Sequence, residues 1–112
     1  MSPKPRPVPR PLKRAEYRIE VASRQAEKGW QELLATTRSA VVDAWDVLTR
    51  TPQDSSPRNH TMRGELATVV RDGRAYERWQ HELPGGARIW FYVHDDTVLL
   101  VDVFTAHPNQ TK

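Results

Sequence analysis

The feature that most constrains the fold is a change of periodicity along the chain. Between about residues 23 and 50, apolar side chains recur at the spacing of an amphipathic helix. They are Trp30, Leu33, Leu34, Val41, Val42, Trp45 and Leu48. After residue 61, short apolar segments alternate with turn signals such as Asp72-Gly73. This order predicts an α+β fold, in which an N-terminal helical hairpin packs on one face of an antiparallel β-sheet.

The element boundaries follow from local signals. Ser23 is a suitable N-cap, and the polar segment 35–39 predicts a break between two helices. Residues 17–22 alternate and predict either a first strand or the lead-in to a helix. The composition of residues 52–61, PQDSSPRNHT, predicts a loop. We expect the remaining strands over residues 66–70, 76–83, 88–93 and 98–104.

Length and composition limit the class of protein. The 112 residues suffice for one domain, which we place at 15–112. Residues 1–14 form a basic, proline-rich arm with a charge of +5, which is expected to be disordered. The arm could serve solubility or add affinity for RNA phosphates. Without cysteines or metal-type histidine spacing, we expect no disulfide, metal or cofactor. Because no long apolar segment or signal peptide is present, we expect a cytoplasmic protein without membrane contact.

The strand that begins at Arg88 predicts one polar face. Alternation places Arg88, Trp90, Tyr92 and His94 opposite the apolar set Ile89, Phe91 and Val93. A hairpin register with Glu82 opposite Arg88 would unite the apolar sets and leave Arg78, Glu82, Arg88 and Tyr92 on one open surface.

This surface has two interpretations. Glu82 and Arg88 could form a surface salt bridge, which contributes little to stability, or an acid–base and phosphate-binding cluster. Trp90 and Tyr92 could stack on unpaired bases, or they could lie buried under a loop or a partner protein.

Other candidates lie outside that strand. His107 is close to the terminus, and it could be a solvent-exposed side chain or a proton carrier. Arg74 and Lys112 are basic residues that we expect to contact RNA. His60 falls in the predicted loop and carries no comparable signal.

The order of elements and the segment from Trp79 to Val93, WQHELPGGARIWFYV, resemble the RelE/ParE superfamily of toxins from type II toxin–antitoxin systems. The resemblance covers about residues 15–112. It implies a helix pair against a curved antiparallel sheet, and it favours the RelE/YoeB-like branch. Members of that branch cleave mRNA in the ribosomal A site without metal, through attack of a 2′-hydroxyl on the adjacent phosphate.

The resemblance also implies roles for single residues. Arg88 matches the arginine that begins the family pattern R-[IVL]-x-[YF] and would stabilise the scissile phosphate. His107 lies near a C-terminal catalytic histidine and would be the general acid, while Glu82 lies near the general base. Arg78 would be a second phosphate contact. Pro108 follows His107 where the YoeB-like pattern has tyrosine, and Phe91 fills the aromatic position of the pattern.

Three functions remain open from the sequence. The first is a ribosome-dependent endoribonuclease whose partners are the ribosome, mRNA and an antitoxin protein. The second is a ParE-like inhibitor of DNA gyrase, which shares the fold but performs no RNA chemistry. The third is a catalytically silent member that uses the sheet only to bind RNA or an antitoxin.

Overall fold

The chain forms two helices and two β-sheets in this computed structural model, which describes residues 5, 8 and 16–105. The helices are α1 (Arg24–Thr36) and α2 (Arg38–Arg50), and short 3-10 turns cover Gly64–Leu66 and Pro84–Gly86. The strands are β1 (Arg18–Val21), β2 (Asn59–Thr61), β3 (Thr68–Arg71), β4 (Arg74–Glu77), β5 (Trp79–Glu82), β6 (Arg88–His94) and β7 (Thr97–Phe104). The α+β class and the N-terminal helix pair are therefore confirmed. Neither helix is long and apolar enough to cross a membrane.

The local signals explain where the helices begin and end. The Ser23 hydroxyl accepts a hydrogen bond from the Ala26 amide at 2.9 Å, so Ser23 is the N-cap of α1 as expected. The predicted break between the helices falls at Thr37, whose non-helical backbone (φ −147°, ψ 54°) separates α1 from α2. Both helices bury one face and leave the other in solvent, as an amphipathic pattern requires.

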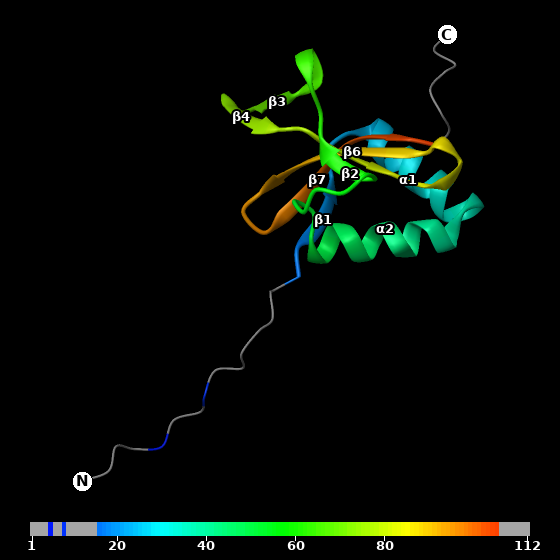
Figure 1. The fold of residues 1–112 in the computed structure, drawn as a ribbon, viewed down its shortest axis with the longest axis horizontal. Coiled ribbons are helices and arrows are strands. Elements are labelled where there is room, and N and C mark those ends of the chain that lie inside the picture. The colour runs from blue at the N-terminus through cyan, green and yellow to red at the C-terminus, as the bar shows by residue number, and fades with distance from the viewer. Residues whose placement is uncertain (1–4, 6–7, 9–15, 106–112) are drawn as a thin grey trace.

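The main sheet has five strands in the order β1-β7-β6-β5-β2. Strands β2, β5, β6 and β7 pair in antiparallel fashion, but β1 pairs parallel to β7. The prediction of a wholly antiparallel sheet is therefore wrong, and the sheet is mixed. β1 and β2 lie at opposite edges of this sheet, and α1 and α2 connect them along the chain (Figure 1).

The main core lies between the helices and the sheet. Ile89, Phe91, Val98 and Val103 have exposed fractions of 0% and contact buried residues of both helices. At Gly29, the backbone of α1 comes so close to β7 that a Cβ atom would stand 2.3 Å from the Val103 carbonyl oxygen. This close contact fixes α1 against β7, which lies between β1 and β6 in the sheet.

The second face of the sheet is only partly open. The β3–β4 hairpin folds over it, with a turn at Asp72 and Gly73 whose φ angles of 52° and 76° suit this pair of residues. Val69 from the hairpin packs against Tyr92 and Val101 of the sheet. Figure 1 shows α2 and this hairpin on opposite sides of the sheet. The expectation of an entirely free face is therefore wrong.

Two expected elements differ in extent. Residues 52–61 were expected to form a loop, but Asn59–Thr61 are strand β2 and pair with β5 at the sheet edge. Residues 76–83 were expected to form one strand, but Arg78 separates β4 from β5, which belong to different sheets. Both differences affect the candidate site, because β2 and β5 carry its side chains.

Candidate functional site: a polar network on the open part of the sheet

The open part of the second face is defined by the register of four strands. Glu82 pairs with Arg88, which confirms the expected hairpin register, and Gln80 pairs with Trp90. On the next strand along, His60 of β2 lies opposite Gln80. On the other side, Arg88 and Trp90 pair with Phe104 and Asp102 of β7. We call the set His60, Gln80, Glu82, Arg88 and Trp90 the polar network.

Gln80 is the centre of the polar network. Its side-chain amide nitrogen donates to Glu82 Oε2 at 3.1 Å. Its Oε1 accepts from Arg88 Nη1 at 3.2 Å and from Trp90 Nε1 at 2.8 Å. Gln80 is 6% exposed, so these contacts are shielded from water. The arrangement fixes the orientation of the amide, because only its nitrogen can donate and only its oxygen can accept.

Glu82 and Arg88 are cross-strand partners, but they do not form an ion pair with each other. Gln80 connects them instead. Among the described residues, the Arg88 guanidinium makes a single hydrogen bond, through Nη1. Its remaining N–H groups are therefore available to an anion such as a phosphate, which a guanidinium can bind through two N–H groups at once.

His60 is the functional candidate that the sequence interpretation missed. Its Nε2 lies 3.3 Å from Glu82 Oε2, and its Nδ1 lies 3.2 Å from the Thr61 carbonyl oxygen. The side chains of His60 and Glu82 are 40% and 41% exposed, so a ligand on the surface can reach both. No local pattern marks His60, because residues 52–61 have the composition of a loop.

A buried asparagine holds β2 in place. The Asn59 amide nitrogen donates to the carbonyl oxygens of Pro52 and Asp54 at 2.9 and 3.1 Å. Its Oδ1 lies 3.1 Å from His81 Nδ1. Because the amide nitrogen is already engaged, Oδ1 must accept, so His81 carries a proton on Nδ1. Burial lowers the pKa of His81, Arg58 lowers it further, and Glu82 opposes them.

An aromatic and cationic group adjoins the network. The Arg78 guanidinium carbon lies 5.4 Å from the centre of the Trp90 ring, and the Phe104 ring meets Trp90 edge-on with centroids 4.8 Å apart. Trp90 is thus held from three directions, by Gln80, Arg78 and Phe104. An arginine over an indole ring is an attractive cation–π contact. A base that stacks on this face of Trp90 would first have to displace Arg78.

Asp102 lies beside this group. Burial raises the pKa of its carboxyl group, while Arg78 and Arg71 oppose the rise. The register between β6 and β7 shifts after Trp90, so that β7 holds one extra residue between Asp102 and Leu100. This β-bulge brings Val101 and Asp102 to the same side of the sheet, with Val101 packed under the β3–β4 hairpin.

Two hollows border the network. One has a volume of about 540 Å³ and is lined by Arg58, Glu82, Arg88 and the turn at residues 83–87, together with Pro57. It places a carboxylate and two guanidinium groups around one space, within the size range of small-molecule sites. The other, about 710 Å³, lies between α2 and the β2–β5 edge and is mainly apolar. We assign the chemistry to the smaller hollow, because Arg88 lines only that one.

The structure brings some of the residues predicted from the sequence together and places others elsewhere. Arg78, Glu82, Arg88 and Trp90 come together as expected. The expectation that Tyr92 lies on the open surface is wrong: it is 7% exposed and stacks against Tyr76 of the hairpin, with ring centroids 4.6 Å apart.

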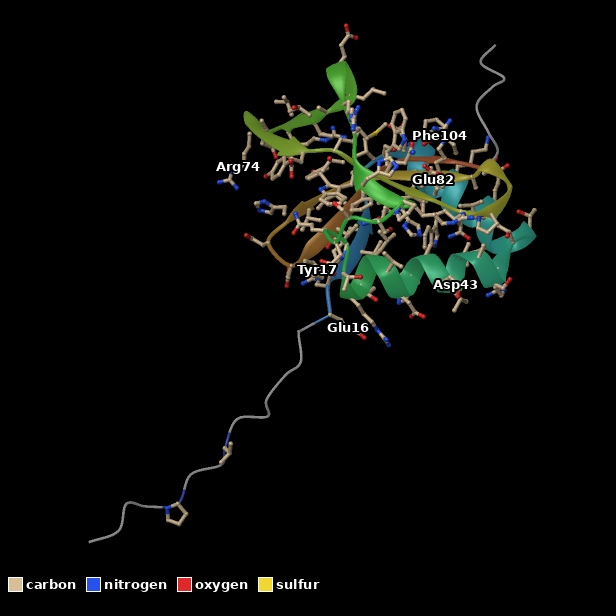
Figure 2. The ribbon with its side chains drawn as sticks, viewed as in Figure 1. Glu16, Tyr17, Asp43, Arg74, Glu82 and Phe104 are labelled. Atoms are coloured by element: carbon tan, nitrogen blue, oxygen red, sulfur yellow. The ribbon has the colours of Figure 1, made fainter. Side chains whose placement is uncertain are left out.

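The remaining candidates do not join the network in the described part of the chain. Arg74 lies on the β3–β4 hairpin, and Figure 2 shows it well away from Glu82. His107 and Lys112 lie outside the described residues. No group of three or more His, Asp or Glu side chains within the described part is arranged to hold a metal ion.

Comparisons with known proteins show a shared fold, but they do not assign the chain to a family. No protein-family profile matches the chain, and no curated protein matches its sequence. A solved structure of a copper-bound mutant toxin from Helicobacter pylori superposes with a TM-score of 0.55 and is 14% identical. The match covers 82% of this chain and 96% of the toxin chain. The chain therefore shares the fold of a toxin.

Proposed function

We propose that this protein is the toxin of a type II toxin–antitoxin module and that it cleaves mRNA on the ribosome. The observation that carries the proposal is the polar network, in which Glu82 and Arg88 face one hollow and are both held by the buried Gln80. A toxin fold at 14% identity and the RelE/ParE-like segment around Arg88 support it.

The reaction follows from these groups. RNA carries its own nucleophile, the 2′-hydroxyl next to the scissile phosphate. Glu82 takes the proton from that hydroxyl, and the 2′-oxygen attacks phosphorus to form a 2′,3′-cyclic phosphate. Arg88 stabilises the charge that develops on the phosphate oxygens. The bond to the 5′-oxygen breaks, and that oxygen leaves with a proton. Because the substrate supplies the nucleophile, the proposed reaction requires no metal.

A ribosome-bound substrate suits the small size of the site. Arg88 of the polar network has Arg78 and Arg58 nearby, but the site offers few groups that could orient a long RNA chain by themselves. A template that presents one phosphate in the required geometry would supply the orientation, which is a large part of the rate enhancement of any such reaction.

A toxin that acts in its own cell requires a neutralising partner, so we propose a protein antitoxin. A segment of that partner would cover the open part of the sheet and exclude RNA. Trp90→Ala distinguishes the two roles of this side chain. Calorimetry with the candidate antitoxin should show weaker binding if Trp90 is an interface anchor, and unchanged binding with reduced cleavage if it contacts RNA.

The test of the proposed function is a cleavage assay with purified protein. An mRNA positioned on ribosomes and the same mRNA free in solution are compared for wild type, Arg88→Ala, Glu82→Gln and His107→Gln. Arg74→Ala is the matched arginine control, because Arg74 is exposed on the hairpin away from the network. We expect cleavage on ribosomes, a loss of about 10²–10³-fold in Arg88→Ala, and wild-type rates in Arg74→Ala.

The contrary outcome is equally specific. Absence of cleavage by wild type, at concentrations that arrest growth of cells, would overturn the nuclease proposal. A supercoiling assay with DNA gyrase would then test the alternative function, inhibition of gyrase by a ParE-like toxin. Equal losses in Arg88→Ala and Arg74→Ala would also contradict the assignment, since they would indicate general electrostatic attraction to RNA in place of a defined site.

A further inference from the structure

His60 is held between two hydrogen-bond acceptors. The Thr61 carbonyl oxygen, which faces Nδ1 at 3.2 Å, can only accept. Glu82 Oε2, which faces Nε2 at 3.3 Å, already accepts from the Gln80 amide, as an ionised carboxylate does. Both ring nitrogens are satisfied together only when each carries a proton. In that doubly protonated form, Nε2 directs its proton at Glu82 Oε2 and has a proton to donate.

The two oxygens of Glu82 differ in the same arrangement. Oε2 receives the contacts from His60 and Gln80, while Oε1 makes no hydrogen bond with any described residue. One oxygen is thus anchored, and the other is available to a ligand in the hollow that Glu82 and Arg88 line. A carboxylate held in this way can accept a proton at Oε1 without losing its position.

We infer that His60 is the general acid of the site and forms an acid–base pair with Glu82. This inference rests on the proposed function and replaces His107, which lies outside the described residues, as the proton donor. The 2′-hydroxyl proton moves to Glu82 Oε1 as the bond from the 2′-oxygen to phosphorus forms. The bond from phosphorus to the 5′-oxygen breaks, and the proton on His60 Nε2 moves to that oxygen. The products are a 2′,3′-cyclic phosphate and a 5′-hydroxyl.

Exchange with solvent then restores the starting state. After one turnover Glu82 holds a proton on Oε1 and His60 has lost one from Nε2. Because the two side chains are 41% and 40% exposed, water takes the proton from Glu82 Oε1 and returns one to His60 Nε2. The cycle balances with solvent as the proton carrier. The network is complete within β2, β5 and β6, and it needs no group from the C-terminal segment.

A substrate with a better leaving group tests this role. In one mRNA the 5′-oxygen at the cleavage position is replaced by sulfur, which departs as a thiolate and needs no proton. The ordinary and the sulfur-containing mRNA are compared on ribosomes for wild type, His60→Gln, Glu82→Gln and His107→Gln. His94→Gln is the control histidine, because His94 lies on the same sheet and contacts Tyr76 at 2.9 Å, away from the network. Thermal melts confirm that each variant is folded.

The expected pattern separates an acid from a base. His60→Gln should lose about 10²–10⁴-fold on the ordinary mRNA. On the sulfur-containing mRNA it should return to within about tenfold of wild type, because the missing acid is no longer needed. Glu82→Gln should be slow on both, since the 2′-hydroxyl must still be deprotonated. His94→Gln should match wild type.

Three results would overturn the inference. If wild type cleaves and His60→Gln is as fast on the ordinary mRNA, His60 has no catalytic role and the proposed function stands without it. If His60→Gln is equally slow on both substrates, His60 positions Glu82 and does not donate the proton. If His107→Gln is the variant that sulfur restores, the acid lies in the C-terminal segment. Absence of cleavage by wild type would remove the proposed function together with this inference.

Discussion

Asn59→Ala should destabilise the protein strongly, because Asn59 joins the loop before β2 to the buried side of β5. Its side chain is 1% exposed and makes three hydrogen bonds, two to the carbonyl oxygens of Pro52 and Asp54 and one with His81. A buried hydrogen bond contributes about 1 kcal/mol net, so three together give about 3 kcal/mol. The truncation also leaves buried partners unsatisfied, which adds to the loss.

The corresponding change in melting temperature is large for a domain of this size. A loss of about 1 kcal/mol lowers Tm by about 4–8 °C in a small domain, so Asn59→Ala should lower it by about 12–24 °C. Thermal unfolding followed by circular dichroism at pH 7 measures the change. Gln53→Ala is the matched control, because Gln53 lies exposed in the same loop and its side chain makes no hydrogen bond in the described structure. The control should stay within about 0.5 kcal/mol of wild type.

The outcome decides whether β2 is held as the structure shows. A decrease of less than about 3 °C in Asn59→Ala would mean that these hydrogen bonds contribute little, well below the range expected for three buried bonds. The position of His60, the next residue along β2, would then lack its main support. A large decrease in both variants would point to a loop that is sensitive to any change, and it would refute the specific role of the Asn59 amide.

Three further predictions test other parts of the structure. Gly29→Ala should destabilise by about 1–3 kcal/mol in urea unfolding, because the new Cβ meets Val103, whereas the same change in an exposed helix stabilises by about 1 kcal/mol. Asp102→Asn should raise Tm at pH 7 but not at pH 3, because burial raises the pKa of the Asp102 carboxyl group. The contribution of this group to stability is therefore complete below its ordinary pKa of 3.8 and is lost as the pH rises through the raised pKa. Gln80→Glu should slow ribosomal cleavage by about 10–100-fold, because it replaces the donor to Glu82 by a second carboxylate; an unchanged rate would show that this hydrogen bond does not organise the site.

The sequence predicts those parts of the fold that depend on local chemistry. The helices follow from apolar spacing and from the Ser23 cap, and the β3–β4 turn follows from the preference of Asp72-Gly73 for positive φ. The pairing of Glu82 with Arg88 was also predictable, because a shift by one residue would have moved the apolar side chains of β5 and β6 to opposite faces.

The parts that the sequence does not predict depend on contacts between distant segments. The parallel pairing of β1 with β7 has no local signature, since a four-residue alternating segment fits either orientation. The burial of Tyr92 depends on which side of the sheet the β3–β4 hairpin covers. Alternation correctly gave Tyr92 the same face as Trp90, but it could not indicate that this face is covered at one end and open at the other.

The contrast between local signals and long-range contacts also applies to the candidate site, of which the sequence predicted only the part on β5 and β6. Gln80, Glu82, Arg88 and Trp90 lie on two strands of one hairpin, so alternation and register are enough to bring them together. His60 lies on β2, an edge strand of three residues without apolar alternation. The buried side chain of Asn59 holds this strand in place. In the proposed chemistry the hairpin provides the base and the phosphate-binding group, while the edge strand provides the acid. Because edge strands open more easily than central ones, local opening of β2 would remove the proton donor while Gln80 still holds Glu82 and Arg88 in place.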